Sequence, residues 1–174
     1  VRRALRSAGF ESDIFVQTAD HRLEDMTRDY RDLLQASDPS NILIHHFSIG
    51  SRASRIAYAV PDRQILVYHN ITPPEFFVNV HEQLAEQCFK GRRELGIYPA
   101  RVDLALGDSE FNRQELAALG FVEARAAVAR EEAVGVVRPP AAVHPVPLER
   151  HAHRVARRRA RAIENQVFVV AANS

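Results

Sequence analysis

Short apolar runs alternate with helical segments along the first 121 residues, and this alternation constrains the fold more than any other feature. The predicted strands are residues 13–17, 41–46, 64–68 and 102–106. In residues 41–46 the apolar side chains do not alternate with polar ones, which favours a strand of a parallel sheet covered on both faces. Strands that alternate with helices imply right-handed crossovers. The chain is therefore predicted to be an α/β protein with a Rossmann-like, mostly parallel sheet flanked by helices.

The segments between these strands carry helix-end signals. Gly9 and Gly120 stand where C-cap glycines belong, and a phenylalanine follows each of them. Helices are expected at residues 1–8, 23–34, 50–60, 73–95 and 109–119. In the fourth, Thr72-Pro-Pro-Glu75 predicts a capping box in which Thr72 is the N-cap. The helically spaced side chains that are expected to face the core are Phe76, Phe77, Val80, Leu84 and Cys88.

Composition narrows the class of protein. With 174 residues, of which 46% are hydrophobic and 26% charged, the chain has the balance of a globular protein and not of a disordered one. A net charge of +1 gives no whole-molecule field for nucleic acid or a membrane. The single cysteine, Cys88, excludes an internal disulfide framework and fits a reducing compartment. Neither a membrane-spanning run nor a secretory leader is recognisable, so we expect a cytoplasmic protein, with a peripheral position at the inner face of the membrane as the alternative.

Ligands of parallel α/β sheets bind at the carboxyl ends of the strands, so residues 45–51, 69–72 and 107–112 are the places to look for a site. His69 and Asn70 follow one strand directly, and His69 can exchange a proton near neutral pH. Prolines and the predicted cap leave few backbone amides there for phosphate, so recognition would depend on these side chains. A histidine held at a strand end by structural hydrogen bonds is the alternative.

The other two strand ends are also candidates. In His45-His-Phe-Ser-Ile-Gly-Ser51, the glycine and the serines can bring amides and hydroxyls to a polyhydroxyl or phosphate ligand, although neither a P-loop nor a GxGxxG pattern is present. Asp108 or Ser109 is expected to cap a helix whose amides are open to an anion, or to act only as a structural cap. The spacing of the histidines matches no zinc pattern, so no metal site is predicted.

Three stretches, ILIHHFSIGS, ILVYHNITPPEFF and RVDLALGDSEFNRQEL, together resemble the N-terminal, acceptor-side domain of family 4 retaining glycosyltransferases with the GT-B fold. The resemblance covers residues 1–121. It implies a nucleotide sugar as the donor substrate, a sugar or lipid-linked acceptor, and neither cofactor nor metal. It also implies that His69 is the catalytic residue, which orients or stabilises the reacting sugar. The remaining implied site residues are Ser48, Gly50, Ser51, Asn70 and Thr72 on the acceptor side, and Ser109, Glu110 and Asn112 elsewhere in the cleft.

The resemblance is incomplete at both ends. In the family, a strand and a Gly-rich loop precede the helix that here begins at Val1, and a donor-binding domain follows. The chain is thus expected to be an incomplete acceptor-side domain that lacks its first, central strand and transfers no sugar alone. Its sheet is expected to have open edges where that strand would pair, with a tendency to aggregate or exchange segments.

Residues 122–174 differ from the first 121, and we treat them as a second region. They begin with a compositionally biased, Pro-containing stretch that looks like a linker and end with a predicted strand at 166–171. Between these lies a basic cluster of Arg150, Arg154, Arg157, Arg158, Arg159 and Arg161. This cluster favours either a non-enzymatic binder of nucleic acid or of an anionic membrane, without a sequence-reading motif, or simply a solvated helix. Residues 159–173 also resemble a short segment of the nitrilase superfamily, which leaves an inactive chimeric fragment as a further alternative.

Overall fold

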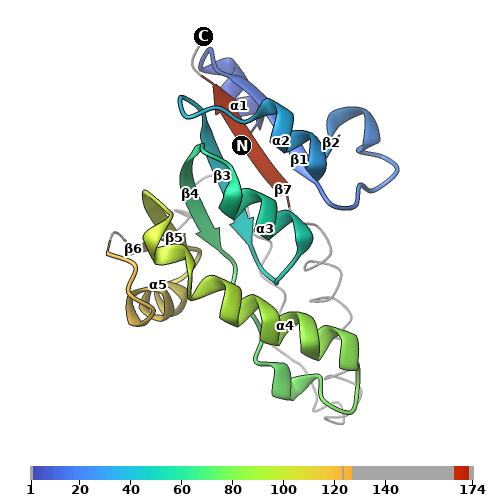
Figure 1. Ribbon diagram of the computed structural model, residues 1–174, viewed down its shortest axis with the longest axis vertical. Coiled ribbons are helices and arrows are strands. Elements are labelled where there is room, and N and C mark those ends of the chain that lie inside the picture. Colours follow the sequence, from blue (N-terminus) through green and yellow to red (C-terminus); the bar gives the residue numbers. More distant parts are fainter. Residues whose placement is uncertain (1, 123, 127–166, 173–174) are drawn as a thin grey trace, which may run out of the picture.

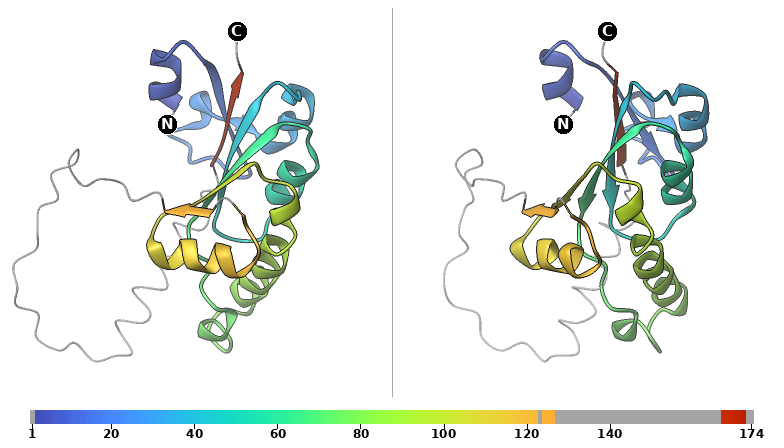
Figure 2. Two further views of the ribbon diagram at one scale, coloured as in Figure 1. Left: turned by 90° about the vertical axis from the view of Figure 1, so that its left-hand side faces the viewer. Right: turned by 60° about the vertical axis from the view of Figure 1, so that its left-hand side comes forward.

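Residues 2–122, 124–126 and 167–172 are described by the structure, a computed structural model. They form an α/β fold in which a seven-stranded sheet has helices on both faces (Figures 1 and 2). The strands are β1 (Glu11–Val16), β2 (Arg28–Asp29), β3 (Ile42–Phe47), β4 (Arg63–Tyr68), β5 (Leu104–Gly107), β6 (Ala124–Ala126) and β7 (Val167–Ala172). Their order across the sheet is β2-β1-β7-β3-β4-β5-β6. The α-helices are α1 (Arg2–Ser7), α2 (Leu33–Ala36), α3 (Arg52–Ala59), α4 (Glu82–Leu95) and α5 (Glu110–Ala118).

The sheet is mostly parallel, as predicted, because β1 pairs with β2 in parallel and so do β3 with β4, β4 with β5, and β5 with β6. α2, α3 and α4 lie on one side of it, and α1 and α5 on the other (Figure 2). Alternate residues of β3 and β4 are buried, and those between them are half-buried or, at Arg63, exposed. Cover on both faces explains why the apolar run of β3 lacks the polar alternation of a one-sided sheet.

The last strand, β7, lies in the middle of the sheet. It runs antiparallel to both neighbours, pairing with β1 from Glu11↔Ala172 to Val16↔Val167 and with β3 from Ile42↔Ala171 to His45↔Phe168. The predicted strand at the end of the sequence is confirmed. The expectation of open edges between β1 and β3 is wrong, because β7 takes up the ladder hydrogen bonds of both strands. The Arg-rich cluster and the predicted linker lie outside the described residues.

Two groups of buried side chains hold the layers together. The larger one joins β3, β4 and β5 to α4 and α5, and includes Tyr68, Cys88 and Leu116. The smaller one consists of Phe15, Leu33, Leu43, Ala53, Ala57 and Val60, and packs β1 and β3 against α2 and α3. Cys88 is 1% exposed, and burial raises the pKa of its thiol, so it is a core residue as predicted.

The predicted glycine caps are confirmed. Gly9 and Gly120 have φ values of 89° and 91°, in the left-handed region that glycine adopts at least cost. The Phe121 amide donates to the Leu116 carbonyl at 3.1 Å, and the Gly120 amide to the Ala117 carbonyl at 3.1 Å. This is the hydrogen-bond pattern of a Schellman motif, which satisfies the last carbonyls of α5.

The predicted helix 73–95 begins nine residues later than expected. Residues Pro74–Phe76 form a 3-10 turn, and α4 begins at Glu82 with His81 as its N-cap, whose Nδ1 accepts from the Leu84 amide at 3.2 Å. The capping box is wrong because Pro74 disfavours helical geometry in the residue before it. Pro73 accordingly has ψ 132°. Thr72 therefore has no helix to cap.

Two other expectations fail for related reasons. Phe76 and Val80 are 72% and 59% exposed, since they precede α4 and do not share its buried face. In place of one helix, residues 23–34 form two 3-10 turns, Glu24–Met26 and Tyr30–Asp32, with β2 between them, and helix α2 begins only at Leu33. The Asp29 carboxylate accepts from the Arg31 amide at 2.9 Å, a local bond that competes with helix formation.

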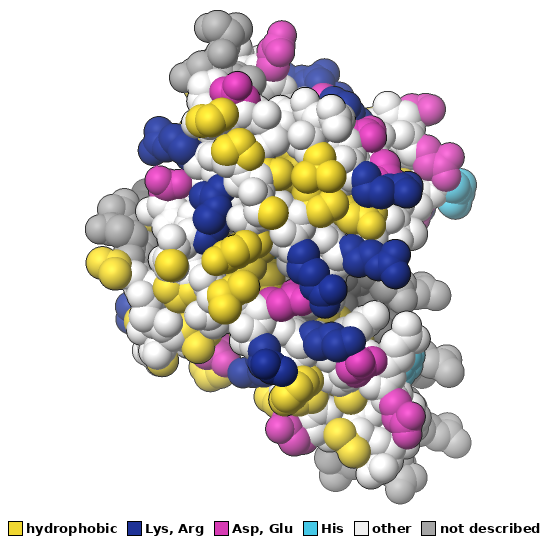
Figure 3. Space-filling model, in the orientation of Figure 1, with side chains coloured by type: hydrophobic (Ala, Val, Ile, Leu, Met, Phe, Trp, Pro, Cys, Tyr) yellow, Lys and Arg dark blue, Asp and Glu magenta, His cyan; other side chains and the backbone are white. Residues whose placement is uncertain are grey.

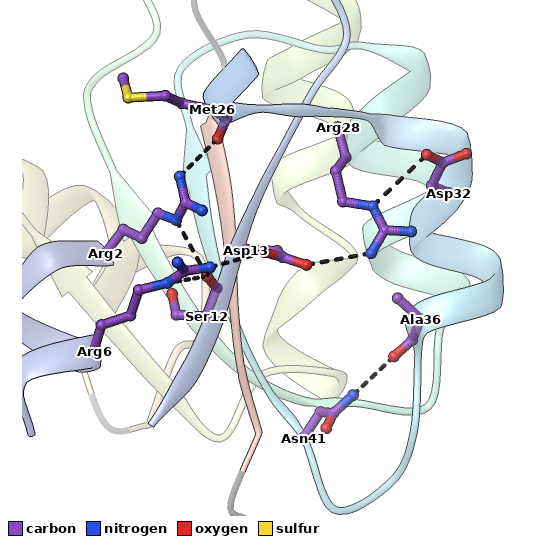
Figure 4. A network of polar contacts seen from close by, with 9 residues as sticks. All are labelled: Arg2, Arg6, Ser12, Asp13, Met26, Arg28, Asp32, Ala36 and Asn41. Carbon is purple, nitrogen blue, oxygen red and sulfur yellow. Dashed lines mark hydrogen bonds and ion pairs between the residues drawn. The ribbon is translucent and has the colours of Figure 1, made fainter. Parts of the chain in front are cut away.

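Arginines attach the first helix to the sheet. Figure 4 shows Arg2 and Arg6 reaching from α1 to the Ser12 carbonyl of β1, with Arg6 Nη2 at 2.8 Å. Arg28 of β2 lies 3.2 Å from the Asp13 carboxylate. None of the helices in the described part of the chain has the length and apolar composition needed to cross a membrane.

Candidate functional site

Three ionisable side chains meet where adjacent parallel strands end. His46 is the fifth residue of β3, His69 directly follows β4, and Asp108 directly follows β5. These strands are neighbours in the sheet and run in the same direction, so their carboxyl ends lie at one edge. This is the edge at which ligands of parallel α/β sheets bind.

The three side chains form a chain of contacts in which His69 is central. His46 Nδ1 lies 2.8 Å from His69 Nε2, and His69 Nδ1 lies 3.4 Å from Asp108 Oδ2. The two imidazole planes are inclined by only 11°, with centroids 5.0 Å apart. A nitrogen–nitrogen distance much shorter than the centroid distance means that the rings meet edge to edge, as an in-plane hydrogen bond requires. Both nitrogens of His69 thus face partners within the protein.

The first turn of α5 holds the carboxylate end of this chain. Asn112, which is 3% exposed, donates from Nδ2 to Asp108 Oδ1. The Asp108 amide donates to the Tyr68 carbonyl at 3.3 Å. Ser109 is the N-cap of α5, accepting from the Asn112 amide at 3.2 Å. Asp108 is thereby fixed to both β4 and α5, and its second oxygen is left for His69.

The electrostatic environment keeps His46 neutral. Burial, and then the neighbouring His69, lowers the pKa of His46 to about 4. Its sequence neighbour His45 has a different role. His45 is fully buried, its ring packs against Phe47 and Tyr98 with centroids 5.3 and 5.4 Å away, and burial lowers its pKa to about 3. His45 is therefore a core residue, while His46 belongs to the site.

The loop after β4 is held rigidly next to His69. The Tyr68 hydroxyl accepts from the Ile71 amide and donates to Glu115 Oε2, both at 3.0 Å. Arg92 of α4 donates to the Ile71 carbonyl at 2.6 Å and pairs with Glu115 at 3.3 Å. Asn70 has φ 61°, a conformation that asparagine tolerates better than most residues. The geometry thus gives Asn70 a structural reason to be present, beside its predicted ligand-binding role.

Several other predicted site residues also have structural roles. Ser51 is the N-cap of α3, accepting from the Ser54 amide at 3.0 Å. A Cβ at Gly50 would lie 2.6 Å from the backbone nitrogen of Gly91, so Gly50 lets its loop contact α4. Glu110 is paired with Arg113 at 2.5 Å. Ser48 and Thr72 are half-buried in the loops after β3 and β4.

Sequence reasoning missed His46 and Asp108 as partners of His69. It treated His46 as one of several unmatched histidines and Asp108 as a possible helix cap. The signal that could have found them was present, because each lies at the end of a predicted strand, as His69 does. The order of neighbouring strands, which brings the three together, was the missing information.

One cavity is at the opposite end of the strands, near their amino ends. It has a volume of about 660 Å³ and is lined by residues near the starts of β1 and β3, among them Arg6, Phe10, Asp13, Asp38 and Asn41. Three of its charged side chains already have partners. Arg6 pairs with Asp13, which also pairs with Arg28 (Figure 4), and Asp38 accepts from the Ser40 amide. We therefore place the candidate site at the His69 edge.

Other features of the described residues add no competing site. On the face shown in Figure 3, basic, acidic and apolar side chains are interspersed, so this face offers no single-signed surface for phosphates. No cluster of three or more His, Cys, Asp or Glu side chains within residues 2–122, 124–126 and 167–172 could hold a metal ion.

No family model, curated protein or solved structure matches the chain. The functional argument accordingly rests on the residues themselves, on the geometry of His46, His69 and Asp108, and on the motif resemblance.

Proposed function

We propose that this chain is the acceptor-side half of a retaining GT-B glycosyltransferase, and that His69 contacts or orients the sugar at the carboxyl edge of the sheet. The observation that carries the proposal is the meeting of His46, His69 and Asp108 at that edge. Each lies within one of the three stretches that resemble the family. Polar side chains held at the carboxyl ends of neighbouring strands suit a ligand rich in hydroxyl groups.

The rest of the edge is compatible with this role. Hydroxyl groups need hydrogen-bond donors and acceptors in fixed positions, and the Tyr68–Glu115–Arg92 network holds the loop that carries Asn70 and Thr72. β7 lies between β1 and β3, where the resemblance expects the family's first strand. The nucleotide-sugar donor would be held by a separate domain, as in the family.

Sugar binding by the full 174-residue chain tests the proposal. The probes are the methyl glycosides of mannose, glucose, galactose and N-acetylglucosamine at millimolar concentrations, followed through the backbone amide NMR signals of the 15N-labelled protein. We expect at least one glycoside to shift amides of residues 45–51, 69–72 and 107–112. We expect His69→Ala to weaken binding and so to reduce these shifts at the same glycoside concentration.

Glycerol is the control, since it offers hydroxyl groups without a sugar ring. The proposal fails if no glycoside shifts these amides, or if glycerol shifts them equally.

A further inference from the structure

The contacts of His69 determine which ring nitrogen of His46 and His69 is free to bind a ligand. A neutral imidazole has one N–H donor and one acceptor nitrogen. The Asp108 carboxylate can only accept, so its position 3.4 Å from His69 Nδ1 stabilises a proton on that nitrogen. His69 Nε2 is then an acceptor, and the proton in its 2.8 Å contact belongs to His46 Nδ1.

The same reasoning fixes the tautomer of His46. If the proton of neutral His46 is on Nδ1, its Nε2 carries a lone pair and no hydrogen. Within the described part of the chain Nε2 has no hydrogen-bond partner, and it is not one of the enclosed polar atoms. His46 is half-buried, so this nitrogen is the accessible end of the contacts that join His46, His69 and Asp108.

We propose that His46 Nε2, and not a nitrogen of His69, accepts the hydrogen bond of a ligand hydroxyl, and that His69 and Asp108 are positioning residues behind it. The inference deepens the proposed function, on which it rests only for identifying the hydroxyl as that of a sugar. It assigns the direct contact with the hydroxyl to His46, and gives His69 the role of positioning His46.

The arrangement also allows His46 and His69 to take up the proton of that hydroxyl. The ligand O–H bond breaks and leaves its electron pair on oxygen, while an N–H bond forms at His46 Nε2. The Nδ1–H bond of His46 breaks, and the proton forms a new N–H bond with His69 Nε2. The positive charge ends on His69, next to the carboxylate of Asp108, and His46 is again neutral. The low pKa of His46 fits a residue that passes charge on.

Direct observation of the ring nitrogens tests the proton arrangement without any activity assay. Long-range 1H–15N NMR of the labelled full chain at neutral pH distinguishes protonated from bare imidazole nitrogens. We expect Nδ1 of both His46 and His69 to be protonated and Nε2 of both to be bare. Asp108→Ala removes the carboxylate that lies 3.4 Å from His69 Nδ1, so His69 should then lose its single tautomer. Glu75→Ala, which removes an exposed carboxylate from the loop after β4, is the matched control and should change neither ring.

Adding a methyl glycoside separates the two proposals. We expect it to shift His46 Nε2 more than His69 Nε2, and His46→Ala to raise its Kd by about 3- to 10-fold, as for loss of one neutral hydrogen bond. A protonated Nε2 on neutral His46 overturns the inference. The inference is also overturned if a glycoside shifts the amide signals of residues 45–51, 69–72 and 107–112 but leaves the His46 Nε2 signal unchanged. A bare Nε2 that no glycoside shifts supports the proton arrangement and contradicts the proposed sugar.

Discussion

At the residue scale, His45 and His46 have opposite surroundings although they are neighbours in β3. Successive residues of a strand point to opposite faces of the sheet, so one of two adjacent histidines can enter the core while the other stays at its margin. His45 packs between Phe47 and Tyr98, and His46 reaches His69. His45 therefore lowers the stability of the fold at low pH, while His46 makes a contact with His69 that can carry a proton.

The buried His45 should make the protein sensitive to acid. Its folded-state pKa is about 3, below the 6.5 of an unperturbed histidine, so the unfolded chain binds more protons between these values. Stability is then fully present above pH 6.5 and is lost as pH falls toward 3, by up to about 1.4 kcal/mol per pH unit. Urea unfolding between about pH 4 and pH 7 measures this slope.

His45→Phe should reduce the pH slope while keeping an aromatic ring in the core. His21→Ala, at an exposed side chain, is the control and should leave the slope unchanged. An equal slope in the wild type and in His45→Phe would show that His45 does not cause the acid sensitivity.

Close backbone contact makes Gly50 intolerant of a side chain. A Cβ there would lie 2.6 Å from the nitrogen and 2.9 Å from the Cα of Gly91, and backbone atoms cannot move aside as a flexible side chain can. We expect Gly50→Ala to destabilise the protein by about 1–3 kcal/mol, the range for overpacking. Gly96→Ala is the control, because a Cβ there would lie 3.4 Å from the Arg93 carbonyl oxygen, at ordinary contact distance. Equal urea midpoints for the two variants would contradict the contact.

At the element scale, helix starts show where local chemistry decides the structure. Ser109 caps α5, whereas Thr72, predicted to cap a helix, precedes a 3-10 turn that begins with proline. We expect Ser109→Ala to cost about 1 kcal/mol and Thr72→Ala less than about 0.5 kcal/mol. Thermal or urea unfolding measures both, and a larger loss for Thr72→Ala would restore the predicted capping box.

Much of the fold followed from sequence because strands and helices of a parallel sheet have distinct apolar patterns. β3, β4, β5, α3 and α5 were predicted within a few residues, and both glycine caps were right. The start of α4 was missed because two successive prolines do not act as one. Pro73 alone would suit a first helical turn, but Pro74 forces it into an extended conformation.

The site was harder to predict than the fold. His69 could be selected because it follows a strand, but its partners depend on which strands are neighbours. That order is a long-range property, and it brings His46, His69 and Asp108 together from positions up to 62 residues apart (108 − 46). Composition and spacing carry no record of it.

At the scale of the whole molecule, β7 connects two parts of the sheet. β1 with β2 lies on one side of it, and β3 to β6 lie on the other (Figure 1). Apart from β7, the two parts share the buried group that joins Phe15 and Leu33 to Leu43 and α3. β7 also pairs with β3 as far as His45, one residue before His46. Loss of β7 should therefore affect both the sheet and the site.

Val169→Pro tests this dependence on β7. Val169 stands opposite Ile14 on one side and Ile44 on the other, and proline cannot donate to a ladder. We expect a loss of at least about 1–3 kcal/mol, the cost of a buried acceptor left unsatisfied, and aggregation through the newly open edges of β1 and β3. Urea unfolding and light scattering measure the two effects. Arg125→Pro, in the edge strand β6, is the matched control, since edge strands tolerate proline better. If neither variant aggregates and both are equally stable, the sheet does not depend on β7.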